Sequence, residues 1–240
     1  MIALTLSGIG KTYTLETKQV SAVADINLTI ETGRFVTIVG RSGCGKTTLL
    51  RLIAGLEPTS CGTMVFNPAN AKIGLVFQEP RLMPWLTVEK NMAFALLNEQ
   101  DRDRVQQTVA HYLKMLHLED FSKAYPVQIS GGMAQRTALG RALCYNPDII
   151  LMDEPLGALD AFTRASLQKE LINIFLLSKK TILFVTHDVD EAVLLGQQVI
   201  VMGNGRILEN IPVPLAYPRI TASKEFYDIR TQVLQAIMLE

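Results

Sequence analysis

Long apolar runs are absent from this 240-residue sequence, although 48% of its residues are hydrophobic and its mean hydropathy is +0.22. No run reaches the roughly 18 residues that a helix needs to cross a bilayer. Residues 1–6 also lack the basic start and the cleavage site of a signal peptide. We therefore expect a cytoplasmic protein whose surplus of apolar residues supplies docking surfaces as well as a core.

An excess of either charge is also absent, because 23 Lys and Arg residues balance 23 Asp and Glu residues. Proteins that bind nucleic acid through its phosphates commonly carry a basic surplus, so we expect no nucleic-acid partner. Cysteine is scarce as well. Cys44, Cys61 and Cys144 have neither the spacing of a zinc site nor a disulfide pattern. This cysteine usage fits a reducing compartment.

What the sequence does contain is a glycine-rich stretch, around which the rest of the chain is organised. It fits the phosphate-binding loop pattern and reads Gly40, Arg41, Ser42, Gly43, Cys44, Gly45, Lys46, Thr47 and Thr48. A β-branched apolar strand at 35–39 precedes it, and a helix with apolar periodicity follows it as far as Gly55. The order strand, glycine loop, helix is the context that phosphate binding requires, whereas a chance glycine turn needs no such flanks.

The chemistry of this loop follows from its residue types. Glycines permit backbone angles and a close approach that side chains would block. Loop amides and the helix N-terminus then face the phosphates with partial positive charge. Lys46 would place a full charge on the β- and γ-phosphates, and the Thr47 hydroxyl would hold Mg²⁺. Cys44, beside Lys46 at a helix N-terminus, is expected to be a reactive thiol, unless its side chain has no role in the loop.

Strands and helices alternate along much of the chain and predict an α/β fold with a parallel sheet. Strands are expected at 2–6, 19–30, 63–66, 73–77, 149–152, 181–185 and 199–202, with Tyr13 in a turn between the first two. In the second strand Ile26, Leu28 and Ile30 alternate with polar residues, which favours an antiparallel β subdomain. Helices are expected at 161–177 and 188–195, and a hairpin turn at 203–205 leads into 206–209.

A long helical stretch interrupts this alternation. Residues of about 87–145 show helical periodicity and contain no strand, so we interpret them as an inserted helical subdomain. A last helix at about 222–238 is expected to pack on the core. The whole chain, 1–240, is therefore expected to form a single domain without repeats.

Two further patterns carry chemistry. Asp153 and Glu154 end an apolar strand, where an Asp would meet a Mg²⁺ shell and a Glu could polarise an attacking water. Ser130, Gly131 and Gly132 open a helix and resemble a second anion site. Taken alone, the acidic pair is typical of a solvated strand end and the Ser-Gly-Gly run of a simple helix cap.

Taken in order, these patterns resemble the nucleotide-binding subunits of ATP-binding cassette (ABC) transporters over nearly the whole chain. Gln78 at a strand end, the run 157–160 and the run 186–188 complete the set. The resemblance implies a P-loop NTPase core with an N-terminal antiparallel β subdomain and an inserted helical signature subdomain. Ile129 and Met133 differ from the family signature, Gly157 stands where Ser is frequent, and nothing in the sequence explains Gly140 within a helix.

The resemblance implies a role for each matched residue. Tyr13 would stack on the adenine of ATP, and Asp153, Thr47 and Gln78 would surround Mg²⁺. Glu154 would be the catalytic base and His187 would contact the γ-phosphate, with Lys46 beside them. The signature residues are Ser130, Gly131 and Gly132. They would bind the γ-phosphate of an ATP held by the other subunit. Asp160 would lie at the subunit boundary.

The implied activity is ATP hydrolysis by a head-to-tail homodimer that drives solute import. Without a membrane span of its own, the chain would act on the inner face of the membrane through separate permease subunits, with a solute-binding protein outside. Residues 81–85 and Met133 resemble importers of nitrate, sulfonates, taurine and thiamine precursors. We therefore expect a small anion, sulfonate or vitamin-precursor solute, although an ATPase subunit does not touch it. Residues 81–85 would form part of the permease docking surface, unless Trp85 packs inside the helical subdomain.

Two other functions are compatible with a phosphate-binding loop. A soluble ABC ATPase acting on DNA or the ribosome usually carries a coiled-coil insertion or a second cassette, and this sequence has neither. A phosphate-loop kinase would leave the Ser-Gly-Gly signature and His187 unexplained.

Overall fold

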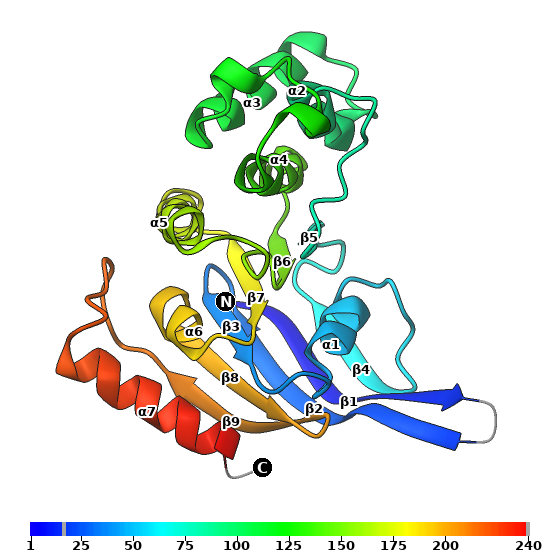
Figure 1. The fold of residues 1–240 in the computed structure, drawn as a ribbon. Helices are drawn as coiled ribbons and strands as arrows, with labels where there is room; N and C mark the ends of the chain where they lie inside the picture. Colours follow the sequence, from blue (N-terminus) through cyan, green and yellow to red (C-terminus); the bar gives the residue numbers. More distant parts are fainter. Residues whose placement is uncertain (16–17, 239–240) are drawn as a thin grey trace. The chain divides into compact units, whose positions relative to one another are not determined.

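The computed structural model describes residues 1–15 and 18–238 and divides the chain into two compact units (Figure 1). The first unit combines Met1–Ala71 with Phe175–Glu240, and the second is Lys72–Ile174. Within the described residues, no helix is both long enough and apolar enough to cross a membrane.

The first unit begins with a three-stranded antiparallel sheet. Strand β1 (Ile2–Leu15) lies between β2 (Lys18–Glu31) and β4 (Cys61–Phe66). The predicted alternation in β2 is confirmed, since Ile26, Leu28 and Ile30 are buried and the residues between them are exposed. The predicted turn position of Tyr13 is wrong. Strand β1 continues far beyond residue 6, and Tyr13 pairs with Val20 of β2.

A second sheet in the first unit is built around β3 (Phe35–Val39), all five residues of which are buried. This strand runs parallel to both β7 (Thr181–Thr186) and β8 (Gln198–Gly203), as expected from alternating strands and helices. Strand β9 (Arg206–Pro212) is antiparallel to β8, which confirms the predicted hairpin. The phosphate-binding loop leaves the end of β3 and enters α1 (Lys46–Ile53).

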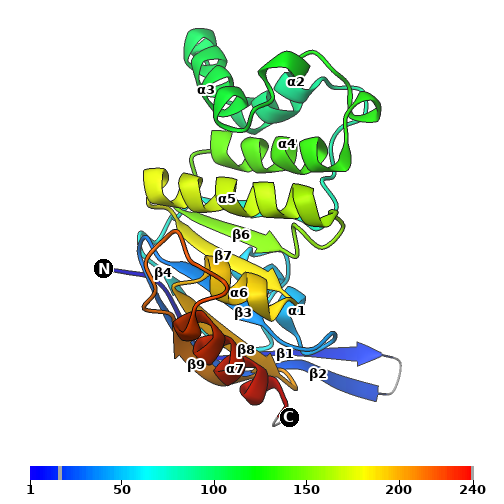
Figure 2. The same ribbon diagram turned by 60° about the vertical axis from the view of Figure 1, so that its left-hand side comes forward.

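Helices α6 (Val189–Leu195) and α7 (Lys224–Met238) pack against this second sheet. Figure 1 and Figure 2 both show α7 lying along β8 and β9. The buried cluster between them includes Val199, Ile211 and Phe226. Helix α7 closely matches the last helix predicted from the sequence, and it packs on the core of the first unit.

The second unit contains the parallel strand pair β5 (Ile73–Val76) and β6 (Ile149–Asp153) and most of the helices. The helices are α2 (Val88–Ala93), α3 (Arg102–Met115), α4 (Gly131–Cys144) and α5 (Ala161–Ser178), with 3-10 turns at Phe94–Leu96, Glu119–Phe121 and Pro126–Gln128. Helix α5 begins in this unit and ends in the first. This compact unit is therefore larger than the helical segment expected at about 87–145.

Gly140, unexplained by the sequence, lies where three helical segments meet. A Cβ at this position would lie 2.4 Å from Cε of Met92 and 2.9 Å from Cδ1 of Leu116. Both side chains are fully buried. The glycine makes helix formation less favourable by about 1 kcal/mol relative to Ala. It also lets α4 approach α2 closely.

Candidate nucleotide-binding site

The glycine loop follows a path that only glycine permits at two positions. Gly45 has a φ of 101°, and a Cβ there would lie 2.3 Å from the carbonyl oxygen of Ala22 in β2. A Cβ at Gly40 would lie 2.1 Å from the carbonyl oxygen of Met202 in β8. Any side chain at either position would push the loop away from these strands.

The turn between β8 and β9 holds the loop from another direction. Its residues Asn204 and Gly205 both have positive φ, 45° and 76°, as the tight two-residue hairpin turn requires. The amide of Gly205 donates to the carbonyl oxygen of Cys44 at 3.1 Å, and its own carbonyl accepts from Ala24 of β2 at 2.8 Å. The loop is thus fixed by contacts with two strands and one turn, which pre-organises it for a ligand.

Lys46 is only 5% exposed, and its Nζ donates to the carbonyl oxygens of Gly40 at 2.8 Å and Arg41 at 2.9 Å. Two loop carbonyls therefore turn toward the lysine. The helix that follows is capped by Gly45, which has no side chain to accept hydrogen bonds, and its first turn holds no acidic residue. Because the first N–H groups of a helix lack intrahelical partners, an anion fits this end. The loop suits the phosphates of a nucleotide.

Cys44, expected from the sequence to be a reactive thiol, is shielded from solvent. Its side chain is only 6% exposed, and its Sγ lies 3.9 Å from Nζ of Lys46, inside the loop. A reagent would have to open the loop to reach it.

His187 follows β7 in a turn that its neighbours hold in place. The hydroxyl of Thr186 donates to Oε2 of the buried Glu191 at 2.6 Å and accepts from the amide of Asp188 at 3.0 Å. Oδ1 of Asp188 accepts from the amide of Glu191 at 3.1 Å and so caps α6. The imidazole of His187 is exposed on this fixed turn. The glycine loop, Tyr13 and His187 all belong to the first unit.

The acidic pair and Gln78 belong to the second unit. Asp153 is the last residue of β6, and Glu154 has a φ of 45°, in the left-handed region that residues other than glycine rarely adopt. A Cβ at Gly157 would lie 3.5 Å from Nε2 of Gln78 and 3.9 Å from Oε2 of Glu154. The amide and the carboxylate therefore face the same small space. A side chain such as Ser would fit at Gly157 in ordinary contact.

The signature residues of α4 have separate roles. Ser130 is the N-cap, and its hydroxyl accepts from the amide of Met133 at 3.3 Å. A Cβ at Gly131 would meet nothing within 4 Å, whereas one at Gly132 would lie 2.4 Å from Cγ2 of Thr163. Gly132 is thus required by the packing of α4 on α5, which lie side by side in Figure 2. Gly131 faces open space, where a ligand can approach its backbone.

Asp160 caps the start of α5. Its Oδ1 accepts from the amides of Phe162 and Thr163, each at 3.1 Å. Hydrogen bonds from Thr163, first from its side chain and then from its amide, lower the pKa of the Asp160 carboxyl. The cap therefore fixes Thr163 where it packs on Gly132.

The donor chemistry for a metal is that of a hard cation. Thr47, Asp153 and Gln78 offer hydroxyl, carboxylate and amide oxygens, which are ligands that Mg²⁺ prefers. Among the described residues, no group of three His, Cys, Asp or Glu side chains lies close enough together to hold a metal. The residues fit Mg²⁺ that is bound through one or two side chains and the phosphates of a nucleotide.

Comparison with known proteins agrees with this geometry. Residues 23–157, which include the glycine loop, the signature and the acidic pair, match the family described as ABC transporter. The chain belongs to this family. A member of this family binds and hydrolyses ATP, so the resemblance seen in the sequence is confirmed and the kinase alternative is wrong.

Relatives of known name cover almost the whole chain. It is 44% identical to the aliphatic sulfonates import ATP-binding protein SsuB of Bacillus cereus, over 98% of this chain and 95% of the relative. The protein of that name from Bacillus subtilis is 43% identical, over 97% and 93%. A relative from Methanocaldococcus jannaschii, 43% identical, is an uncharacterised ABC transporter ATP-binding protein.

Two solved structures of the ABC transporter cassette MJ0796 share the fold at 31% identity, with TM-scores of 0.79 and 0.80. Each is covered completely and matches 89% of this chain. Both are dimeric, and one is a post-hydrolysis state bound to ADP and Pi. The P-loop NTPase fold predicted from the sequence is therefore confirmed.

Proposed function

We propose that this ABC ATPase drives import of an aliphatic sulfonate or a closely related small anion. The observation that carries the proposal is the 44% identity to a sulfonate import ATP-binding protein across 98% of the chain. In this proposal the chain acts at the cytoplasmic face of the membrane, bound to permease subunits. A solute-binding protein outside the membrane delivers the solute.

The proposed ATP site uses the residues that match the sequence motifs of the family. The glycine loop binds the phosphates, Lys46 neutralises their charge, and Tyr13 stacks on the base. Thr47, Asp153 and Gln78 would hold Mg²⁺, which would supply positive charge to the phosphates. Glu154 accepts a proton from the attacking water, and His187 contacts the γ-phosphate. The convergence of Gln78 and Glu154 beside Gly157 supports these assignments.

The backbone of Glu154 gives separate support. A left-handed conformation at a residue other than glycine costs on the order of 1–3 kcal/mol and tends to occur at functional sites. Here it is held by a hydrogen bond from the amide of Gly157 to the carbonyl oxygen of Glu154 at 3.1 Å. A glycine in this position would relieve the backbone strain, but it would lack the carboxylate that Glu154 supplies.

The active form in this proposal is a head-to-tail homodimer. Ser130, Gly131 and Gly132 bind the γ-phosphate of the ATP on the partner subunit, and Asp160 lies at the boundary. The open space at Gly131 and the exposed cap at Ser130 support this role. The dimeric state of the MJ0796 cassette supports it as well.

Residues 81–85 form the proposed permease contact. Trp85 is 73% exposed, so its packing inside the helical segment, the alternative considered from the sequence, is wrong. The loop around it is anchored at both ends. Arg141 donates to the carbonyl oxygens of Pro80 and Arg81, both at 2.9 Å, and the fully buried Asn91 bonds the backbone of Met83 and Leu86. A rigid loop that exposes a tryptophan is suited to docking.

A gene deletion in the native host tests the proposed function. We expect the deleted strain to lose uptake of isotope-labelled ethanesulfonate and growth on ethanesulfonate as the sole sulfur source. Growth on sulfate should continue. The wild-type gene should restore uptake, and the Lys46→Ala variant should not. If the deleted strain takes up sulfonate normally but no longer takes up another solute, that other solute is the one transported.

A further inference from the structure

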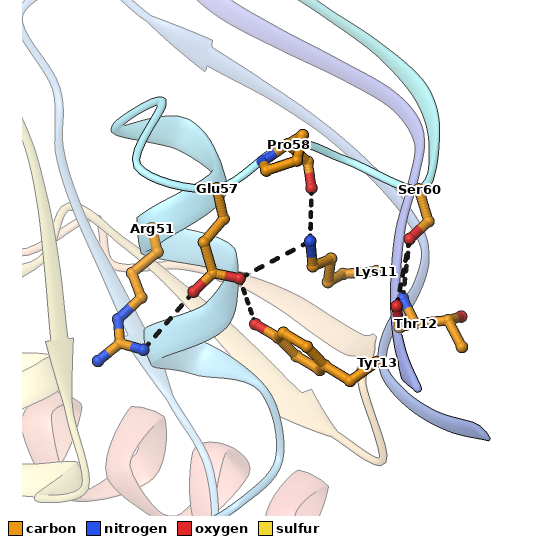
Figure 3. Close-up of polar contacts among 7 residues, drawn as sticks. All are labelled: Lys11, Thr12, Tyr13, Arg51, Glu57, Pro58 and Ser60. Atoms are coloured by element: carbon orange, nitrogen blue, oxygen red, sulfur yellow. Dashed lines mark hydrogen bonds and ion pairs between the residues drawn. The ribbon is translucent and has the colours of Figure 1, made fainter. Parts of the chain in front are cut away.

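A carboxylate outside the glycine loop holds the hydroxyl of Tyr13. Glu57 follows α1, and its Oε2 accepts a short hydrogen bond from the Tyr13 hydroxyl. The same carboxylate lies 3.8 Å from Nζ of Lys11 and 3.6 Å from Nη1 of Arg51. Figure 3 shows Glu57 between these three side chains, with its carboxylate facing all of them. No sequence pattern singled out Glu57.

The loop that carries Glu57 makes further hydrogen bonds with β1. Nζ of Lys11 donates to the carbonyl oxygen of Pro58 at 2.8 Å. The amide of Thr12 donates to the hydroxyl of Ser60 at 3.0 Å, and the amide of Ser60 donates to the carbonyl oxygen of Gly10 at 2.8 Å. The connection from α1 to β4 thus fixes the backbone of β1 next to Tyr13 and the end of the Tyr13 side chain.

Because this network is partly buried, its interactions should be stronger than those of an ordinary surface ion pair. The side chains of Lys11 and Glu57 are only 13% and 23% exposed, while that of Arg51 is 48% exposed. The hydrogen bond to Glu57 raises the pKa of the Tyr13 hydroxyl, with smaller contributions from burial, and a hydrogen bond with Thr48 acts in the opposite direction. A tyrosine hydroxyl is protonated at neutral pH in any case, and the raised pKa keeps it a donor to higher pH. Its contact with Thr48 places it beside the first turn of α1.

One face of the Tyr13 ring is also engaged. Nζ of Lys11 lies 5.1 Å from the ring centroid, in cation–π range. A base would then stack on the opposite face. Since stacking depends on the position and tilt of the ring, an anchor at the hydroxyl end determines how well a base fits.

We infer that Glu57 is a positioning residue for adenine recognition, because it holds the Tyr13 hydroxyl and so fixes the ring on which the base stacks. This inference rests on the proposed role of Tyr13 as the base platform. It adds a residue whose effect is confined to the base and does not extend to the phosphates.

The test compares binding of ATP with binding of inorganic tripolyphosphate, which carries phosphates but no base. In the wild-type background, Tyr13→Ala should weaken ATP binding about 10-fold or more, since stacking supplies on the order of 1–3 kcal/mol per base. Glu57→Ala should weaken ATP binding about 3- to 10-fold through loss of ring positioning. Neither change should alter tripolyphosphate binding by more than about 2-fold, and both should raise KM for ATP with little change in kcat.

A double-variant cycle separates positioning from a general structural role. If Glu57 acts through the Tyr13 hydroxyl, Tyr13→Phe should reproduce most of the Glu57→Ala effect, and the combined variant should be no weaker than the weaker single one. Glu57→Gln keeps an acceptor for the hydroxyl and should recover part of the ATP affinity. Glu31→Ala is the matched control, because Glu31 also pairs with an arginine, Arg34, on the surface.

The outcomes distinguish the role of Tyr13 as the base platform from the positioning role of Glu57. If Tyr13→Ala leaves ATP affinity unchanged, the base platform itself is wrong. If Tyr13→Ala weakens ATP binding but Glu57→Ala does not, only the positioning role is overturned. Equal losses of ATP and tripolyphosphate affinity, or effects that multiply in the cycle, would also overturn it, since Glu57 would then support the fold and not the ring.

Discussion

Nζ of Lys46 donates to the carbonyl oxygen of Gly40 across 2.8 Å, so the loop itself holds the lysine ammonium group in place. This contact exists because the loop doubles back on its own first residue. This path of the loop requires that Gly40 pack against Met202 and that Gly45 pack against Ala22. The proposed phosphate site thus depends on packing of the loop against β2 and β8.

Two glycines in this loop should respond differently to alanine. Both Gly43 and Gly45 have positive φ, at 82° and 101°, but a Cβ at Gly43 would meet nothing within 4 Å. Gly43→Ala should therefore cost about 1–2 kcal/mol of unfolding free energy, from backbone conformation alone. Gly45→Ala should cost about 1–3 kcal/mol more, because the new methyl group overlaps β2. Urea unfolding measures both, and equal losses would contradict the packing argument.

The loop also illustrates what local pattern can and cannot predict. Its sequence, the strand before it and the helix after it were all predicted, because a phosphate loop is a continuous stretch with fixed spacing. Ala22 and Met202 lie far away in the sequence and contribute only backbone carbonyls, so no residue type marks them. Contacts through the backbone leave no signature in a single sequence.

Tyr13 and Gly140 show the same limit in other elements. The short apolar pattern of residues 2–6 ended the predicted strand too early, because pairing with β4 extends β1 to Gly10 and pairing with β2 extends it to Leu15. Gly140 has low helix propensity, but a Cβ there would overlap the side chains of Met92 and Leu116, which belong to separate segments. Glu57, too, was predicted only as part of a turn.

The three cysteines should differ in reactivity with iodoacetamide. Cys61 is exposed and should be labelled first. Burial raises the pKa of the Cys144 thiol to about 12, since burial disfavours the charged thiolate. At pH 8 only about one thiol in 10⁴ would be ionised, and its labelling should require unfolding. Labelling of Cys144 in the folded chain should therefore be very slow at pH 8 and become faster with each rise in pH, whereas unfolding should expose the thiol at once.

Mass spectrometry of timed samples measures the order of labelling. Cys44, buried in the loop, should react slowly and become slower with Mg-ATP, whereas the rate at Cys61 should not change. Rapid labelling of Cys144 in the folded protein, or of Cys44 as fast as Cys61, would contradict the burial that the structure shows.

Trp85→Ala should separate transport from ATP hydrolysis. Because the side chain is 73% exposed, the unfolding free energy should change by no more than about 0.5 kcal/mol. The isolated subunit should bind and hydrolyse ATP normally, while solute uptake by the assembled transporter falls. The matched variant is Asn91→Ala, which removes the buried side chain that anchors the same loop and should cost about 2 kcal/mol or more. Loss of ATP binding in Trp85→Ala would rule out a role limited to docking.

Glu154 gives the sharpest test of the proposed mechanism. Glu154→Gln keeps the shape and one acceptor oxygen, so ATP should still bind. Without a base, turnover should fall by at least ~10²-fold. The two bound ATP molecules should then keep holding the Ser130 helix of each subunit against the glycine loop of the other, and an ATP-dependent dimer should accumulate on sizing chromatography. Lys46→Ala should do the opposite, losing nucleotide affinity and never forming the dimer.

A second substitution at the same position distinguishes catalysis from structure. Glu154→Gly relieves the left-handed backbone at φ 45° and should raise the unfolding free energy by about 1 kcal/mol while abolishing hydrolysis. A purely structural Glu154, which only pairs with a neighbouring cation, predicts the reverse: stability falls in both variants and no ATP-dependent dimer forms. Near-normal hydrolysis by Glu154→Gln would remove this residue from the chemical step. Gain of stability together with loss of turnover in Glu154→Gly would show that the fold tolerates strain here because the carboxylate is needed.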